Sequence, residues 1–446
     1  MTRRPGRLGR TWNRMMGANE MTPPGSLQSS REHWKNTILA GLANYIDAGS
    51  IVSGSAALAL WASAYHLSNT FIGVLGAFSA NAISAGVGAL VGGRLCDLYG
   101  RKRIYQYDML FYAFGMLWLV FATQPWMIVL GSILVGLAVG ADIPASWSLI
   151  AEMAPPNERG KHSGVAQVLW YLGPVVVLAM FLVLAPLGVL GARIVFAHLA
   201  IVAVVLTLLR SSMKESVVWE AAKAERLADP TLRGGAWKAL FTPRHIKSIL
   251  FLVGMYGVWN LWAGTNGFFF PYILRTVGAQ SQTVAVAMQA GGFLIAMGSI
   301  NFVFMRFSDR MNQRTLLAIS SIIQVIGMAL LALFPLTTPV ALSYLVLVWF
   351  GSGFGAQSFF QLWSAELFPT LLRSTAQGFT FAVGRIGLGL WSFFVPILTA
   401  TGFNRLAWIL TGFLVVSGLI GFFGAPDHAG KSLDQIEAER RGVSGD

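Results

Sequence analysis

Long apolar stretches separated by short polar segments run along almost the whole chain. Each stretch holds about 20 residues or more, the length that a helix needs to cross a hydrocarbon core of about 30 Å. The stretches are apolar throughout, whereas the strands of a membrane barrel alternate apolar and polar positions. The pattern predicts an all-α membrane protein with twelve transmembrane helices, near residues 36–62, 70–92, 104–123, 126–151, 163–187, 189–210, 247–275, 283–305, 314–335, 339–364, 374–400 and 404–424.

The polar segments predict two bundles of six helices. Residues 211–246, with Pro, Gly and charges of both signs, form the only long internal polar segment. We expect this segment to be a cytoplasmic loop with a short amphipathic helix around 217–227 on the membrane surface. The predicted division is a cytoplasmic arm at 1–35, an N-terminal bundle at 36–210, the central loop at 211–246, a C-terminal bundle at 247–424 and a cytoplasmic tail at 425–446.

Two polar motifs occur once in each half of the chain. They recur 214 and 212 residues later: Glu152 and Arg159 return as Glu366 and Arg373, and Asp97 and Lys102 return as Asp309 and Arg314. A period near half the chain length indicates duplication of one large unit rather than a solenoid of short repeats. In so apolar a chain, this duplication is typical of a transporter made of two similar halves.

Composition and charge narrow the class of protein further. Hydrophobic residues make up 55% of the chain and charged residues 11%, although the net charge is +13. All but four of the 32 Lys and Arg residues fall on one predicted side of the membrane, the exceptions being Arg193, Arg275, Arg385 and Arg405. This positive-inside asymmetry predicts a multi-pass protein of the cell (cytoplasmic or inner) membrane with both termini in the cytoplasm. The basic excess therefore encodes topology and does not indicate nucleic-acid binding.

The segment from Gly93 to Lys102, Gly-Arg-Leu-Cys-Asp-Leu-Tyr-Gly-Arg-Lys, resembles the loop 2–3 signature of the major facilitator superfamily. Leu98 departs from the family pattern, and the second copy has Asn312 in place of the glycine. The acid, proline and arginine motif that closes the tenth predicted helix is similar to that of the sugar porters, the inositol transporters among them. The resemblance implies a major facilitator fold of two pseudo-symmetric bundles.

The same resemblance implies secondary active transport by alternating access. We expect proton-coupled uptake of a small polar metabolite, a sugar or a polyol such as inositol, with the proton as coupling ion and no other cofactor. A monomer is expected, because each chain holds both halves. Cys96 is the only cysteine, so no internal disulfide or metal cluster is expected. The sequence has no motif of a primary pump, a zinc protease or a serine hydrolase in a context where it could function, so we do not expect an enzyme.

Charged residues at the helix ends predict a gate. An acid beside arginines at a helix end forms charge-assisted bonds that hold one conformation and break when the halves rock. The alternative is a topology anchor only. We expect a neighbouring arginine to neutralise each of Glu152 and Glu366. The predicted gating residues are Arg94, Asp97, Arg101, Lys102, Glu152, Arg159, Asp309, Arg310, Arg314, Glu366 and Arg373.

Four ionisable residues lie inside the predicted spans, where charge is costly and indicates function. Asp47 resembles the span-one acid of proton-coupled sugar porters and is predicted to face a cavity and carry the proton; the alternative is a structural acid. Asp142 would share that task or hold a substrate group, since Ser132 occupies the position where those porters carry an arginine. Arg385 would pair with Asp47 or Asp142 across a central cavity, or meet a substrate carboxylate. His198 is interpreted as a satisfied buried histidine.

Amides and aromatics in the spans predict a substrate site. Gln167 and Asn266 lie where sugar porters carry sugar-binding amides, and amides suit a polyhydroxylated ligand because they both donate and accept hydrogen bonds. The structural alternative is helix–helix bonding. The predicted binding residues are Gln167, Asn260, Trp262, Asn266, Gln361 and Arg385.

Other functions remain open from the sequence. One alternative is a proton-coupled symporter of carboxylates or aromatic acids, with Arg385 as the anion clamp. A drug exporter is disfavoured by the intramembrane amides. A non-transporting membrane sensor would need a folded signalling domain, for which the polar segments are too short.

Overall fold

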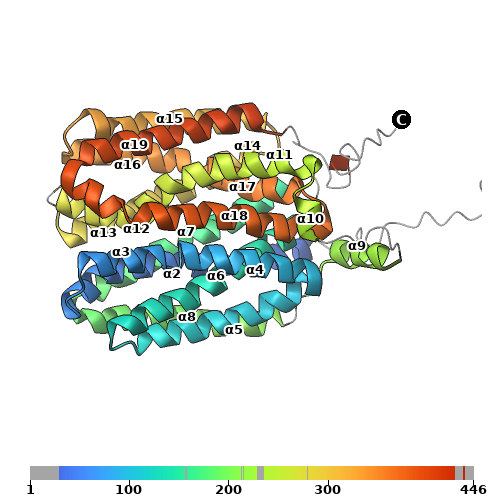
Figure 1. Ribbon diagram of the computed structural model, residues 1–446, viewed down its shortest axis with the longest axis horizontal. Helices are drawn as coiled ribbons and strands as arrows, with labels where there is room; N and C mark the ends of the chain where they lie inside the picture. The colour runs from blue at the N-terminus through green and yellow to red at the C-terminus, as the bar shows by residue number, and fades with distance from the viewer. Residues whose placement is uncertain are drawn as a thin grey trace, which may run out of the picture.

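The computed structural model describes residues 30–155, 158–211, 213, 215–228, 236–278, 280–426 and 435–436. The predicted arm up to residue 29, most of the predicted tail and part of the central loop lie outside this range. The described part of the chain is helical and contains no strand. Figure 1 shows two layers of long helices, the earlier part of the chain (blue to green) below and the later part (yellow to red) above.

Each predicted span of the first half corresponds to one helix or to two consecutive helices. A break near Asn81 divides the second span. The helices are α2 (Ser30–Ala64), α3 (Asn69–Ala77), α4 (Ile83–Tyr99), α5 (Arg101–Val120), α6 (Pro125–Met153), α7 (Arg159–Val183) and α8 (Val189–Arg210), with the short 3₁₀ turn η2 (Ala185–Leu187) before α8.

The second half follows the same order with more interruptions. Its helices are α11 (Pro243–Leu252), η4 (Val253–Gly257), α12 (Val258–Thr276), α13 (Gln282–Ser299), η5 (Ile300–Phe304), α14 (Met305–Phe307), α15 (Gln313–Leu333), α16 (Thr338–Gly353), α17 (Ala356–Glu366), α18 (Thr370–Ser392) and α19 (Val395–Gly424). Eight stretches in the described residues are by themselves long and apolar enough to cross a membrane. Of the remaining spans, α3 and α4 are each too short, with 9 and 17 residues, and α2, α5 and α18 carry buried charged or polar residues.

The outer surface is apolar, as contact with lipid requires. Large side chains stand fully open on it, among them Phe121, Val183, Phe302 and Phe423, at 69–78% exposure. Soluble proteins rarely expose large contiguous apolar patches. Several charged side chains are instead buried between the helices, among them Asp47, Asp142, Arg210 and Arg385.

The two halves meet along α4 and α18, where the backbones touch. A Cβ on Gly93 would lie 2.2 Å from the carbonyl oxygen of Ser374, and a Cβ on Gly378 would lie 2.1 Å from that of Ala89. Small residues at a helix crossing allow such an approach in a membrane. We propose that the boundary of the two halves lies in the predicted central loop, between α8 and α11.

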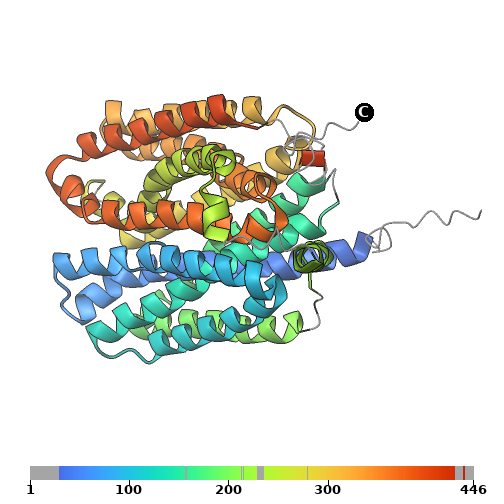
Figure 2. The same cartoon turned by 45° about the vertical axis from the view of Figure 1, so that its right-hand side comes forward.

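Short helices gather at one end of the molecule. Helices α9 (Val217–Ala228) and α10 (Ala236–Leu240) lie at this end, beside the beginning of α11, and Figure 2 places the beginning of α2 there as well. Helix α9 confirms the amphipathic helix predicted around 217–227. We call this end of the molecule the latch end, because the contacts described next lie there.

Candidate functional site, a central cavity above a charged latch

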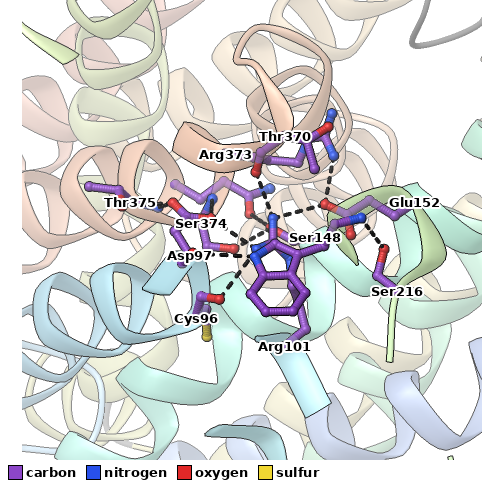
Figure 3. Close-up of polar contacts among 12 residues, drawn as sticks. Cys96, Asp97, Arg101, Ser148, Glu152, Ser216, Thr370, Arg373, Ser374 and Thr375 are labelled. Carbon is purple, nitrogen blue, oxygen red and sulfur yellow. Dashed lines mark hydrogen bonds and ion pairs between the residues drawn. The ribbon is translucent and has the colours of Figure 1, made fainter. Parts of the chain in front are cut away.

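Asp97, near the end of α4 in the first half, binds α18 of the second half (Figure 3). Its carboxylate accepts hydrogen bonds from the backbone N–H groups of Ser374 and Thr375, at 3.3 and 2.7 Å, and from the Thr375 hydroxyl at 2.7 Å. It also pairs with Arg101 at 3.1 Å. The beginning of a helix carries a partial positive charge that favours a carboxylate. The Asp97 contact therefore joins the halves.

Arg101 and Glu152 extend this network. The Arg101 guanidinium donates from Nη2 to Glu152 Oε1 at 2.9 Å and to the carbonyl oxygen of Thr370 at 2.7 Å. Glu152 Oε1 also accepts a hydrogen bond from Arg373 Nη1 at 2.7 Å. Trp219 of α9 covers the network and donates to the Asp97 carbonyl oxygen at 3.2 Å. The three charged side chains are buried, so their bonds are not weakened by solvent.

The second copy of the motif repeats this arrangement with the halves exchanged. Glu366 of the second half pairs with Arg159 of the first at 3.2 Å. Asp309 accepts the N–H groups of Gly160 and Lys161 at the beginning of α7, at 3.0 and 3.1 Å. Burial raises the pKa of Asp309, although the two N–H donors oppose the shift. Each glutamate thus has an arginine of the opposite half beside it, Arg373 for Glu152 and Arg159 for Glu366, while Arg101 pairs with Glu152 from within the first half.

Four predicted gating residues do not bridge the halves. Within the described residues, Arg94 has no hydrogen-bond or ion-pair partner, and the side chains of Lys102 and Arg310 form no ion pair. Arg314 donates to the carbonyl oxygen of Ala425 at 3.2 Å, inside the second half. We call the remaining seven gating residues the latch: Asp97, Arg101, Glu152, Arg159, Asp309, Glu366 and Arg373.

A cavity of about 50 Å³ lies between the halves. Its wall is mainly aromatic with a few polar groups, the usual character of a small-molecule site. At about 10–15 Å³ per water, it holds only a few waters, so the site is contracted while the latch is closed. The lining residues are Ile51, Val52, Asn81, Trp170, Tyr171, Trp259, Asn260, Trp262, Ala263, Gly264, Gly267, Phe293, Trp349, Ser352, Gln357 and Arg385.

Arg385 lies in the cavity wall and is bound by neutral groups. Its Nη1 donates to the backbone carbonyl oxygen of Asn81 at 3.1 Å and to the side-chain oxygen of the same residue, and its guanidinium lies 4.5 Å from the ring centroid of Phe381. Among the residues that the structure describes, it forms no ion pair. The predicted pairing of Arg385 with Asp47 or Asp142 is therefore wrong. Asn81, at the break between α3 and α4, was not predicted.

The predicted amides lie in different places, and only Asn260 lines the cavity. Asn260 lines the cavity, as does Trp262, and Asn260 donates to the carbonyl oxygen of Gly384 at 3.4 Å. Gln167 and Gln361 hydrogen-bond to each other across the halves and do not line the cavity. On their helices they lie between cavity-lining Tyr171 or Gln357 and the latch.

Asn266 is used inside the second half and does not line the cavity. Its amide donates to the Trp262 carbonyl oxygen at 3.0 Å and its side-chain oxygen accepts a hydrogen bond from Tyr344. Asn266 therefore has the alternative role named above for the amides, that of a helix–helix hydrogen bond. The sequence also offered no specific signal for Trp170, Tyr171, Trp349, Ser352 and Gln357, which line the cavity because of how the helices pack.

Asp47 and Asp142 do not line the cavity either. They lie inside the first half together with Asp108 of α5 and Arg210 of α8, and Arg210 Nη1 is 3.5 Å from Asp142 Oδ1. Asp108 and Arg210 were not predicted as site residues, although each is a charged residue inside a predicted span. His198 hydrogen-bonds to the Tyr45 hydroxyl at 2.8 Å, as a satisfied histidine would.

Comparison with known proteins agrees with the resemblance that the motifs indicated. Residues 37–392 match the family described as Major Facilitator Superfamily. The chain is 47% identical over 415 residues to the minor myo-inositol transporter IolF of Bacillus subtilis, covering 92% of this chain and 94% of that protein. It is 25% identical over 395 residues to the cis,cis-muconate transport protein of Acinetobacter baylyi, covering 85% and 91%.

A solved structure shares the fold. The proton:xylose symporter XylE bound to 6-bromo-6-deoxy-D-glucose superposes with a TM-score of 0.77 at 19% identity, covering 92% of this chain and 100% of that chain. The predicted fold is thereby confirmed.

Proposed function

The chain belongs to the major facilitator superfamily, and on this premise we propose that it takes up a polyol or sugar, such as inositol, together with a proton. As a member, it is a multi-pass membrane transporter of a small-molecule substrate and not an enzyme. The single observation that carries the substrate class is the 47% identity, over nearly the whole chain, to a myo-inositol transporter.

The geometry supports alternating access. The cavity lies between the halves, and the latch end holds bonds that join residues of opposite halves, among them Glu152 with Arg373 and Glu366 with Arg159. Opening that end therefore breaks these bonds. We place the latch end in the cytoplasm, as the positive-inside asymmetry predicts, with both termini on that side of the cell membrane and a monomer as the working unit.

Different residues of the cavity wall would bind the ring and the hydroxyl groups of the substrate. Trp170, Trp259 and Trp262 offer apolar faces to a ring, and Asn260 and Gln357 offer both donors and acceptors to hydroxyl groups. Gln167 and Gln361 would turn to the substrate when the latch opens and their mutual bond breaks. Asp47 would carry the coupled proton, and Asp142 would tune its proton affinity.

Uptake of labelled myo-inositol into proteoliposomes, with and without an inward proton gradient, tests this function. We expect accumulation only with the gradient and loss of at least tenfold in uptake for Trp262→Ala. The matched control is Trp408→Ala, which alters a tryptophan 48% exposed on the outer surface. Wild-type protein that does not transport inositol would contradict the proposed substrate.

Arg385 favours a second candidate, a carboxylate substrate. A buried guanidinium in a cavity wall without a carboxylate partner among the described residues is costly, and an anionic ligand would remove that cost. In the same proteoliposomes, labelled cis,cis-muconate in place of inositol tests the candidate. Uptake of muconate that Arg385→Gln abolishes would support it, and failure of the wild type to transport muconate would exclude it.

A further inference from the structure

A second polar centre lies inside the first half, apart from the cavity. Four helices each contribute one charged residue to it: Asp47 from α2, Asp108 from α5, Asp142 from α6 and Arg210 from α8. Their exposures are 1, 6, 0 and 0%. Three carboxyl groups thus share one guanidinium in a buried site, which we call the acid cluster.

Arg210 can neutralise only one of the three acids. Its Nη1 lies 3.5 Å from Asp142 Oδ1 and 3.3 Å from the Tyr105 carbonyl oxygen, and its guanidinium is 3.5 Å from the centroid of the Tyr105 ring. Its Nε and Nη2 are buried and have no acceptor in the described part of the chain. Half of the guanidinium is therefore available for a further negative charge.

Asp47 and Asp108 lack the partners that an ionised carboxylate needs. All four of their carboxyl oxygens are buried and accept no hydrogen bond of good geometry from the described residues, although the Met109 N–H lies near Asp108, and both side chains lie near Asp142 and Arg210. Burying an ionised carboxylate without donors is very costly, and like charges so close cannot all be ionised. With the latch closed, two protons in the cluster would balance its charge against the single guanidinium.

Neighbouring titratable groups do not supply these donors. The Tyr105 hydroxyl donates to the Ala40 carbonyl oxygen at 2.6 Å, and the Tyr112 hydroxyl donates to that of Ile46 at 2.8 Å. On the α4 side, the buried Cys96 lies beside the latch, since its carbonyl oxygen accepts a hydrogen bond from Arg101 Nη1 at 3.3 Å.

The cluster is also connected structurally to the latch end. Asp108 follows Arg101 by seven residues on the same helix, about 10 Å along its axis. Arg210 ends α8, and five residues later Glu215 accepts the backbone N–H of Arg101 at 3.1 Å. Movement of Arg101 when the latch opens would therefore reach both Asp108 and the end of α8.

A small cavity whose mainly apolar wall includes three serines lies close to the cluster in the first half. Ser50, one turn after Asp47, lines a cavity of about 20 Å³ together with Ser79 and Ser132. That volume holds about one water, which three hydroxyls can bind. Ser132 is the position at which the sequence lacks the arginine of proton-coupled sugar porters, and Arg210 supplies a guanidinium to Asp142 from another helix instead.

We propose that Asp108 carries the coupled proton jointly with Asp47, and that Arg210 is the fixed positive charge that receives the carboxylate left behind. The inference rests on the proposed proton-coupled uptake. A proton enters by the serine-lined cavity while the latch is closed. When the latch opens, water reaches the cluster from the latch end, Asp108 or Asp47 loses its proton to that water, and the remaining negative charge binds the free N–H groups of Arg210.

Asp108→Asn in proteoliposomes tests this role. The amide keeps the shape of the side chain but cannot release a proton, so gradient-driven accumulation of labelled inositol should fall at least tenfold. Counterflow exchange of inositol without a gradient should stay within about twofold of wild type, because exchange needs no net proton movement. Tyr107→Phe, altering a residue 67% exposed on the same helix, should change neither.

Asp108→Glu separates coupling from a structural role. The glutamate retains a titratable group at a changed position, so accumulation should persist with a shifted pH profile. Loss of both exchange and accumulation in Asp108→Asn, with an unshifted profile in Asp108→Glu, would overturn the inference. If Asp108→Asn accumulates inositol as well as the wild type does, the inference is overturned and the proposed function still stands. A wild type that exchanges inositol but never accumulates it would refute proton coupling itself.

Discussion

Glu152 of the first half accepts a hydrogen bond from Arg373 of the second half at 2.7 Å. The residues 214 positions away make the reciprocal contact, since Glu366 of the second half pairs with Arg159 of the first at 3.2 Å. Each copy of the duplicated motif thus supplies the partner of the other copy. Such bonds form only when the halves meet, so the state of the latch reports the conformation of the whole transporter.

Glu152→Gln should open the latch. The change leaves Arg101 and Arg373 facing a neutral amide in a buried site, and breaking a buried pair costs about 3–5 kcal/mol. Cys96 is the only cysteine and is buried beside the latch. We expect maleimide to label Cys96 at least ten times faster in the variant. Arg310→Gln, altering an exposed arginine without an ion pair among the described residues, should label as slowly as wild type, and equal rates in all three proteins would contradict the assignment.

Gly378→Ala should prevent close contact of the halves. Its Cβ would lie 2.1 Å from the backbone oxygen of Ala89, which cannot rotate away as a side chain can. Inositol uptake should fall at least tenfold because α4 and α18 are forced apart. Gly387→Ala is the matched control on the same helix, since nothing lies within 4 Å of a Cβ at that position. Equal losses in the two variants would show that the crossing is not the cause.

Gln167 and Gln361 should behave as one unit. Removing either leaves the other with a buried polar group unsatisfied, at a cost of about 1–3 kcal/mol. The double alanine variant should therefore lose less uptake, measured as kcat/KM for inositol, than the two single losses combined predict. Gln167→Ala combined with Gln289→Ala is the control, because Gln289 donates to the Gly267 carbonyl oxygen instead. Additive losses for the first pair would contradict a direct bond.

Acid should favour the closed latch through Asp309. Burial raises the pKa of this carboxyl in the closed state above the usual value of about 3.9, so the closed state binds a proton more tightly than an open state with Asp309 in water. The closed state therefore gains stability as the pH falls from the raised pKa toward the usual one, and loses it as the pH rises.

Labelling of Cys96 in folded protein, divided by labelling of unfolded protein at the same pH, measures this dependence and cancels thiol ionisation. The ratio should decrease on acidification in wild type and be flat in Asp309→Asn. An identical slope in the two proteins would assign the pH dependence to another group.

The membrane-spanning segments were predictable from the sequence because the length of an apolar stretch reflects the thickness of the bilayer. The latch residues Asp97, Glu152, Asp309 and Glu366 were also predictable, since each recurs at the same place in both halves. Their partners were not, because the spacing of a motif along the chain does not say which half supplies the arginine.

A charged residue inside a predicted span indicates function, and this applies to Asp108 and Arg210 as well as to Asp47. The sequence alone does not show that these three residues lie close together. With Asp142 they lie on four helices, and only the packing of those helices turns three acids and one base into a single buried cluster away from the cavity. The sequence by itself determined the helices, the duplication and the identity of the charged residues, because these depend on local composition. The tertiary structure decided which charges neutralise each other and which face the cavity, because both depend on distances between segments remote in the chain.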